Sequence, residues 1–172
     1  FVAGCDSLLH IIDLTQGKEA ASVPIESPTG VTPAVLGDKV FFGTEAGEVY
    51  CLSAAGEVRW STTLDGCFGR AFPLIADVDR DGAYEVYFPT AFNNPQPGLF
   101  ALDARTGKRR WKSPSVLQSY RSTVMADLDG NGRNEILFGD KNSRLFCVDA
   151  KGRQRWTRQL SGRGIFFAPA VA

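Results

Sequence analysis

The chain has 172 residues, of which 44% are hydrophobic and 22% are charged, a composition typical of a folded globular protein. Its 19 basic and 19 acidic residues give a formal net charge of zero, which argues against nucleic acid or an anionic membrane surface as the partner. No apolar stretch approaches the roughly 20 residues that a membrane-spanning helix needs, so we expect no membrane span.

The same strand-and-turn sequence pattern occurs four times along the chain. The copies occupy residues 10–18, 50–57, 100–108 and 146–153. Their equivalent positions are separated by 40, 50 and 46 residues and are Asp13, Ser53, Asp103 and Asp149. Repeats of this length are typical of propellers and other repeat proteins, and they place all of residues 1–172 in one domain or one four-repeat segment.

A second pattern recurs with the same phase. It occupies residues 32–35, 72–75, 122–125 and 168–171, and its markers Pro33, Pro73, Thr123 and Pro169 are again 40, 50 and 46 residues apart. Two unrelated patterns that keep one spacing indicate a true structural repeat.

Short runs of β-branched and aromatic residues fill the space between these markers. Examples are residues 39–43, 85–88 and 135–139, each bounded by Gly, Asp or Asn. No amphipathic helical pattern fits. We therefore predict an all-β fold, a β-propeller built of about four four-stranded antiparallel blades.

One tryptophan closes each of the last three repeats. Each follows the glycine of its turn by four residues, and the three are Trp60, Trp111 and Trp156. The regular interval predicts a tryptophan packed between neighbouring blades, with stacking on a ligand as the alternative.

The two ends of the chain leave the blade count open. Residues 166–172 read as the first strand of a blade and residues 1–4 as the second. Joined, they would close a four-bladed ring. The same ends would also arise from cutting four blades out of a propeller of six to eight blades, which is the more usual size, and we favour such a segment.

Two repeats carry an acidic loop with the pattern D-x-[DN]-x-[DN]-G-x-x-E, at residues 77–85 and 127–135. Alternate oxygen-bearing side chains, a glycine for the bend and a final carboxylate are what Ca²⁺ needs for its six to eight oxygen ligands. The predicted ligands are Asp77, Asp79, Asp81, Glu85, Asp127, Asp129, Asn131 and Glu135. A polar turn without metal is the alternative. No nucleophile or base stands beside these loops, so we expect a structural ion and no catalytic residues.

A basic residue precedes the expected inner strand in three repeats, at Arg70, Arg121 and Arg163. These side chains would form a cationic ring at the channel mouth that contacts a carboxylate or phosphate ligand. The alternative, which we favour, is that they pair with nearby acidic groups or lie in solvent. The long loop at residues 90–98 is either a contact surface or a tolerated insertion.

The four cysteines form no C-x-x-C pair, and His10 is the single histidine, so zinc is not expected. Cys51 and Cys147 occupy the position that Ala101 has in another repeat, which predicts small buried thiols. We interpret His10 as an ordinary strand residue without a catalytic partner.

Residues 100–111 resemble the tryptophan-docking motif of the pyrroloquinoline quinone (PQQ) repeat, found in the quinoprotein alcohol dehydrogenase-like superfamily. Residues 51–60 and 147–156 are weaker copies that lack one residue in the turn. The acidic loops are similar to FG-GAP or VCBS-type calcium-binding repeats.

This resemblance implies two kinds of function. The quinoprotein dehydrogenases of the superfamily oxidise alcohols or sugars with PQQ and Ca²⁺, but they hold the quinone with an adjacent cysteine pair and use about eight blades. Neither is present here. Similar propellers without the catalytic residues, such as bacterial outer-membrane assembly lipoproteins, bind proteins or other ligands.

We therefore expect a non-enzymatic extracytoplasmic propeller, periplasmic, cell-surface or secreted, that acts as a protein- or ligand-binding scaffold stabilised by Ca²⁺. A fragment of a PQQ-dependent alcohol or sugar dehydrogenase is the alternative. A glycan-binding or glycan-processing propeller is a further alternative. The sequence names no ligand or partner, because propellers of one fold bind many different ones.

Overall fold

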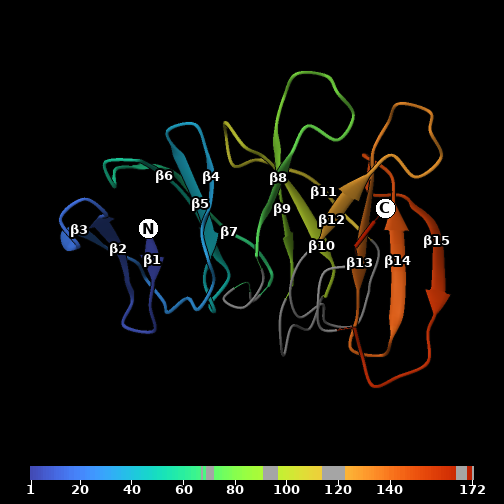
Figure 1. Ribbon diagram of the computed structural model, residues 1–172, viewed down its shortest axis with the longest axis horizontal. Coiled ribbons are helices and arrows are strands. Elements are labelled where there is room, and N and C mark those ends of the chain that lie inside the picture. The colour runs from blue at the N-terminus through green and yellow to red at the C-terminus, as the bar shows by residue number, and fades with distance from the viewer. Residues whose placement is uncertain (67, 69–71, 91–96, 114–122, 166–169, 172) are drawn as a thin grey trace.

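The computed structural model describes residues 1–66, 68, 72–90, 97–113, 123–165 and 170–171 (Figure 1). The described residues form β-strands and turns and contain no helix, and hence none long and apolar enough to cross a membrane. The strands make four antiparallel sheets that follow one another in chain order along the molecule (Figure 1). The all-β prediction is confirmed.

Three of the sheets are complete four-stranded blades whose strands lie in sequence order, as expected for a propeller. The second blade contains β4 (Ala34–Leu36), β5 (Lys39–Gly43), β6 (Glu48–Ser53) and β7 (Val58–Thr63). The third contains β8 (Leu74–Ala76), β9 (Glu85–Pro89), β10 (Leu99–Asp103) and β11 (Arg109–Lys112). The fourth contains β12 (Val124–Ala126), β13 (Glu135–Gly139), β14 (Arg144–Val148) and β15 (Gln154–Gln159).

The first sheet has three strands, β1 (Val2–Ala3), β2 (Leu8–Asp13) and β3 (Lys18–Pro24). β1 pairs with β2 as β5 pairs with β6, so the N-terminal segment is the second strand of its blade, as predicted. Most of residues 166–172, expected to supply a first strand, lie outside the described residues.

Apolar side chains fill the space between neighbouring blades. Phe41 of the second blade packs in one cluster with Phe88 and Phe100 of the third, and Tyr87 of the third blade packs with Phe138 of the fourth. The inner strands β5, β9 and β13 are thus buried at nearly every position between neighbouring sheets, whereas the outermost strands β3 and β15 are largely exposed.

Two of the four cysteines belong to this core. Cys51 and Cys147 are fully buried, as predicted, and burial raises the pKa of each thiol to about 11. Cys5 is exposed, and Cys67 lies outside the described residues. A thiol with so high a pKa is almost entirely protonated at neutral pH and therefore unreactive.

The tryptophans of the second and third blades reach across to the blade that follows. The indole N–H of Trp60 donates to the carbonyl oxygen of Ala104 at 3.2 Å, and that of Trp111 donates to Ala150 at 2.8 Å. Each ring covers the glycine of the next blade's turn, Gly107 or Gly152. Trp156, on the last described strand, is 40% exposed.

His10 on β2 has two carboxylate partners that sequence analysis missed. Its Nδ1 lies 2.9 Å from Glu19 Oε1, and its Nε2 lies 3.0 Å from Asp6 Oδ2. Hydrogen bonds to Glu19 and then Asp6 raise the pKa of the imidazole above its ordinary value of 6.5. Among the described residues no hydroxyl or thiol is hydrogen-bonded to His10, and its two ion pairs join β2 to β3 and to the preceding turn.

We expect this histidine to make stability depend on pH. Because its pKa is raised in the folded state, its contribution is fully present below pH 6.5 and is lost as the pH rises through the folded pKa. NMR titration should give His10 a pKa above 6.5, and Glu19→Gln should lower that pKa. A His10 pKa that Glu19→Gln leaves unchanged would contradict the ion pair.

Candidate metal centre

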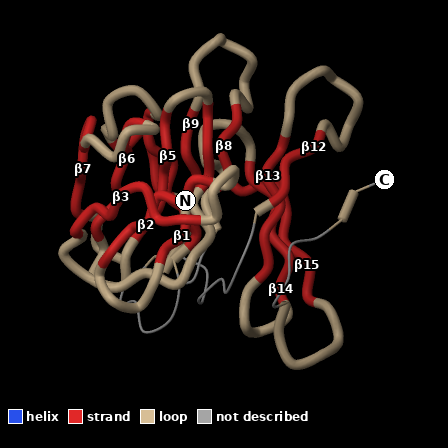
Figure 2. The backbone as a smooth tube through the Cα atoms, turned by 60° about the vertical axis from the view of Figure 1, so that its left-hand side comes forward, coloured by secondary structure: helices blue, strands red, loops and turns tan. Residues whose placement is uncertain are grey.

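The two acidic loops connect the first and second strands of the third and fourth blades. Residues 77–84 join β8 to β9, and residues 127–134 join β12 to β13. Both loops project from the same end of the molecule, at the top in Figures 1 and 2. In the second blade the equivalent connection, between β4 and β5, has only two residues, Gly37 and Asp38.

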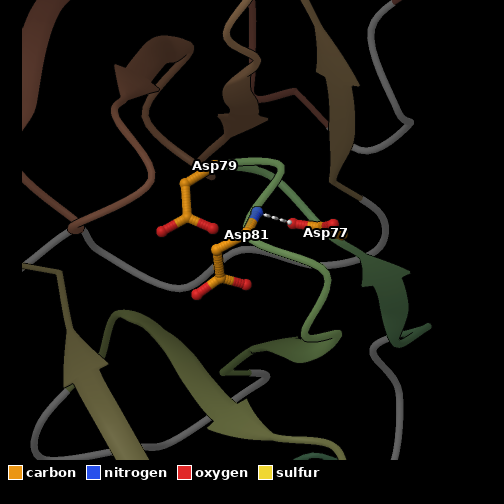
Figure 3. Close-up of side chains that lie close together, drawn as sticks. All are labelled: Asp77, Asp79 and Asp81. Carbon is orange, nitrogen blue, oxygen red and sulfur yellow. Dashed lines mark hydrogen bonds between the residues drawn. The ribbon is translucent and has the colours of Figure 1, made fainter.

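In the first loop, Asp77 organises the backbone. Its Oδ1 accepts the N–H of Asp81 at 3.0 Å and its Oδ2 accepts that of Gly82 at 2.9 Å. Asp81 Oδ1 accepts the N–H of Ala83 at 2.8 Å. Figure 3 shows the carboxylates of Asp79 and Asp81 beside one another, next to Asp77. One oxygen from each of the three lies within 4.8 Å of the others.

The second loop repeats this conformation. Asp127 accepts the N–H groups of Asn131 at 3.1 Å and Gly132 at 2.8 Å, and Asn131 Oδ1 accepts that of Arg133 at 2.8 Å. The fourth residue of each loop has a left-handed backbone conformation: Arg80 has φ of 61° and Gly130 has φ of 70°. A non-glycine residue in that region is uncommon, so this turn is fixed by its hydrogen bonds.

The closing glutamates of the two loops differ in position. Glu135 converges with Asp127 and Asp129 within 4.8 Å. Glu85 is buried at the start of β9, does not join the converging carboxylates, and accepts a hydrogen bond from the Tyr87 hydroxyl at 3.2 Å. Burial, with the negative charge of Asp79 adding to it, raises the pKa of Glu85 to about 7.

In the second loop, an arginine side chain already balances part of the negative charge. Arg155 on β15 donates to Asp129 Oδ2 at 2.8 Å and to Glu135. The equivalent residue of the third blade, Arg110, donates instead to Asp103 at 2.8 Å. Within the described part of the chain, no cationic side chain lies within ion-pair distance of Asp77, Asp79 or Asp81. The first loop therefore holds three uncompensated carboxylates.

The donor set of the first loop fits a hard divalent cation. It offers only oxygen atoms, its residues are exposed or half-buried, and its charges repel one another without a counter-ion. The second loop offers Asp127, Asp129, Glu135 and Asn131, but an ion there must displace Arg155. Sequence analysis could not find this competitor, because Arg155 lies 20 residues beyond Glu135 and meets it only through strand pairing.

Replacing Arg155 should therefore strengthen calcium binding at the second loop. We expect Arg155→Gln to lower the Kd for Ca²⁺ severalfold, because the ion would no longer have to displace the guanidinium from Asp129 and Glu135. Calorimetric titration with CaCl₂ measures it, with the exposed Arg158→Gln on the same strand as the control. Equal affinities in the two variants would mean that the guanidinium does not compete.

The predicted arginine ring falls mostly outside the described residues. Arg163 is exposed, whereas Arg70 and Arg121 lie in segments that the structure does not describe. Residues 91–96 of the long loop also lie outside them. The cationic ring and this contact surface therefore stay predictions.

Comparison with known proteins agrees with the fold. The family model described as outer membrane protein assembly factor BamB matches residues 6–165. No curated protein sequence gives a significant match.

Among solved structures, BamB from Moraxella catarrhalis is 22% identical with a TM-score of 0.68, and the match covers 91% of this chain and 45% of that one. The quinohemoprotein alcohol dehydrogenase of Comamonas testosteroni is 16% identical, with a TM-score of 0.66 and coverage of 88% and 32%. The C-terminal domain of PilY1 from Pseudomonas aeruginosa is 18% identical, with a TM-score of 0.64 and coverage of 86% and 37%.

The chain thus spans less than half the length of these structures. At such identities the likeness concerns the fold and confirms the β-propeller predicted from the repeats, and the family match over residues 6–165 confirms the PQQ-like type that the tryptophan-docking motif indicated.

Proposed function

The chain belongs to the family of the outer membrane protein assembly factor BamB, and from that premise we propose that it is a non-enzymatic, protein-binding propeller that works outside the cytoplasm. The family match over residues 6–165 is the observation that carries this proposal. That family is described as a factor in outer membrane protein assembly, so a polypeptide is the partner class that we favour.

Calcium is proposed as a structural ion in this function. Asp77, Asp79 and Asp81 would hold it in the first loop, and Asp127, Asp129, Asn131 and Glu135 in the second. When bound, the ion supplies positive charge that ties each loop to the end of its blade. Extracytoplasmic calcium is millimolar, which suits loops with few charged ligands, and this supports a periplasmic, cell-surface or secreted location.

A fragment of a quinone-dependent dehydrogenase is the second candidate, favoured by the likeness to the quinohemoprotein alcohol dehydrogenase. No two of the four cysteines are adjacent in sequence, so the cysteine pair expected for quinone binding is missing from this chain. We expect that adding PQQ and Ca²⁺ gives no change in the quinone spectrum and no dye-linked alcohol oxidation. A saturable spectral change would favour the dehydrogenase.

The protein-binding proposal is tested by cross-linking. The full chain, with a photo-reactive group placed on an exposed strand such as β15, is incubated with the cell-envelope fraction of its host. Discrete cross-linked polypeptides that unlabelled chain competes away support the proposal. If none forms and the chain is retained instead on immobilised polysaccharide, the glycan-binding alternative takes its place.

A further inference from the structure

A charged groove lies between the third and fourth blades, at the end where the acidic loops project. Its volume is about 560 Å³. Asp79 and Asp81 of the first acidic loop line it from the third blade. The second acidic loop and the turn between β14 and β15 line it from the fourth blade.

Opposite charges face the groove from its two blades. The third blade contributes the carboxylates of Asp79 and Asp81, and the fourth contributes the exposed cations Arg133, Lys151 and Arg153. In the described part of the chain, no ion pair joins any of these three cations to a carboxylate. The carboxylates and the cations therefore face each other across the groove without pairing.

The other charged residues that line the groove are Glu135, Arg155 and Asp149, all on the fourth blade. Glu135 is bonded to Arg155, and Asp149 Oδ1 accepts the backbone N–H groups of Lys151 and Arg153, each at 2.9 Å. Asp149 keeps its negative charge, but Arg133, Lys151 and Arg153 outnumber it, so the fourth blade presents net positive charge to the groove and the third blade presents only carboxylates.

The groove continues into a second cavity of about 290 Å³. The two share Asp79, Ala150 and Lys151, and the second adds Glu85, Arg110 and Trp111. The site is therefore elongated, and the indole of Trp111 gives it an apolar surface at one end.

We propose that the charged groove binds an extended polypeptide segment in which acidic and basic side chains alternate. In an extended chain successive side chains point to opposite sides. Acidic side chains would then meet Arg133, Lys151 and Arg153, while basic ones meet Asp79 and Asp81. This inference rests on the proposed protein-binding function and assigns it a surface.

The charge distribution disfavours other macromolecules. A nucleic acid or an acidic polysaccharide carries one sign of charge, so the carboxylates of the third blade would repel it. A polypeptide is the polymer that carries both signs at strand spacing. Calcium on the first loop would cover Asp79 and Asp81 and weaken the contacts of the basic side chains.

Fluorescence anisotropy with labelled peptides tests the proposal on the full chain. In low salt with chelator, an octapeptide of alternating Glu and Lys should bind at least tenfold more tightly than a block peptide of four Glu and four Lys. Lys151→Glu should raise the Kd for the alternating peptide at least tenfold, and Asp79→Lys should have the same effect. The matched control Arg158→Glu, on the exposed strand β15 and outside the groove, should change the Kd less than twofold.

Equal Kd values for the two peptides, or unchanged binding in both groove variants with their folding verified by circular dichroism, would overturn the proposal. That failure is distinguishable from failure of the proposed function. Cross-linked polypeptides that persist in Lys151→Glu would leave protein binding in place and move it to another surface, whereas absence of any cross-linked partner would reject protein binding itself.

Discussion

Millimolar Ca²⁺ should raise the Tm of this chain by roughly 5–10 °C over its value in chelator. An ion that binds only the folded state at about 100 times its Kd adds about 2.7 kcal/mol of stability. For a chain of this size, each 1 kcal/mol shifts the Tm by about 2–4 °C. The first acidic loop should provide most of this shift, because its three carboxylates have no ion-pair partner in the described part of the chain.

The variant that tests the contribution of the bound ion alone is Asp79→Ala. Asp77 accepts two backbone N–H groups, so its replacement would damage the loop even without calcium. Asp79 accepts none from the described residues and would lose only its contact with the ion. Differential scanning calorimetry should show that Asp79→Ala removes most of the calcium-dependent shift. Asp38→Ala, in the short connection of the second blade, should leave the shift intact.

A Tm that is the same with Ca²⁺ and with chelator would show that the loops are acidic turns held by their own hydrogen bonds. A calcium shift that survives in Asp79→Ala but disappears in Asp129→Ala would move the ion to the second loop. Arg155 would then be a weaker competitor than its two hydrogen bonds indicate.

The repeat spacing was enough to predict the blades. A strand pattern repeated every 40 to 50 residues indicates a unit that must bury two faces against its neighbours, and β5, β9 and β13 lie where their sequence patterns place them. The first strands were found through the marker at Pro33 and its equivalents, because β4 and β8 begin one residue after it.

Spacing alone could not predict how the site's charges are partnered. Glu85 and Glu135 occupy the same place in their loops, yet one is bonded to Tyr87 and the other to Arg155. The difference depends on where Arg110 and Arg155 point, and side-chain direction of this kind is set by neighbours on other strands. The charged groove was missed for the same reason, since its two walls come from different blades.

Trp111→Ala should destabilise the chain by about 3 kcal/mol, the cost of removing a large core side chain. The ring packs against Tyr87 with centroids 5.7 Å apart and donates to the carbonyl of Ala150, so its loss opens a cavity and leaves an acceptor unpaired. The matched control is Trp156→Ala. That ring is 40% exposed and should cost about 1 kcal/mol or less. Urea unfolding followed by circular dichroism measures both.

The same contact can be broken from the other side at Gly152. A Cβ at this position would lie 2.4 Å from Trp111 Cε3, and the residue has φ of 74°. Gly152→Ala should therefore cost the left-handed backbone strain of about 1 to 2 kcal/mol and the displacement of the indole in addition. Gly17→Ala separates the two effects, because Gly17 has φ of 64° and no atom within 4 Å of the added methyl. If both glycine variants lose the same stability, the indole moves aside freely, and the tryptophan contributes less to the junction between blades than its contacts indicate.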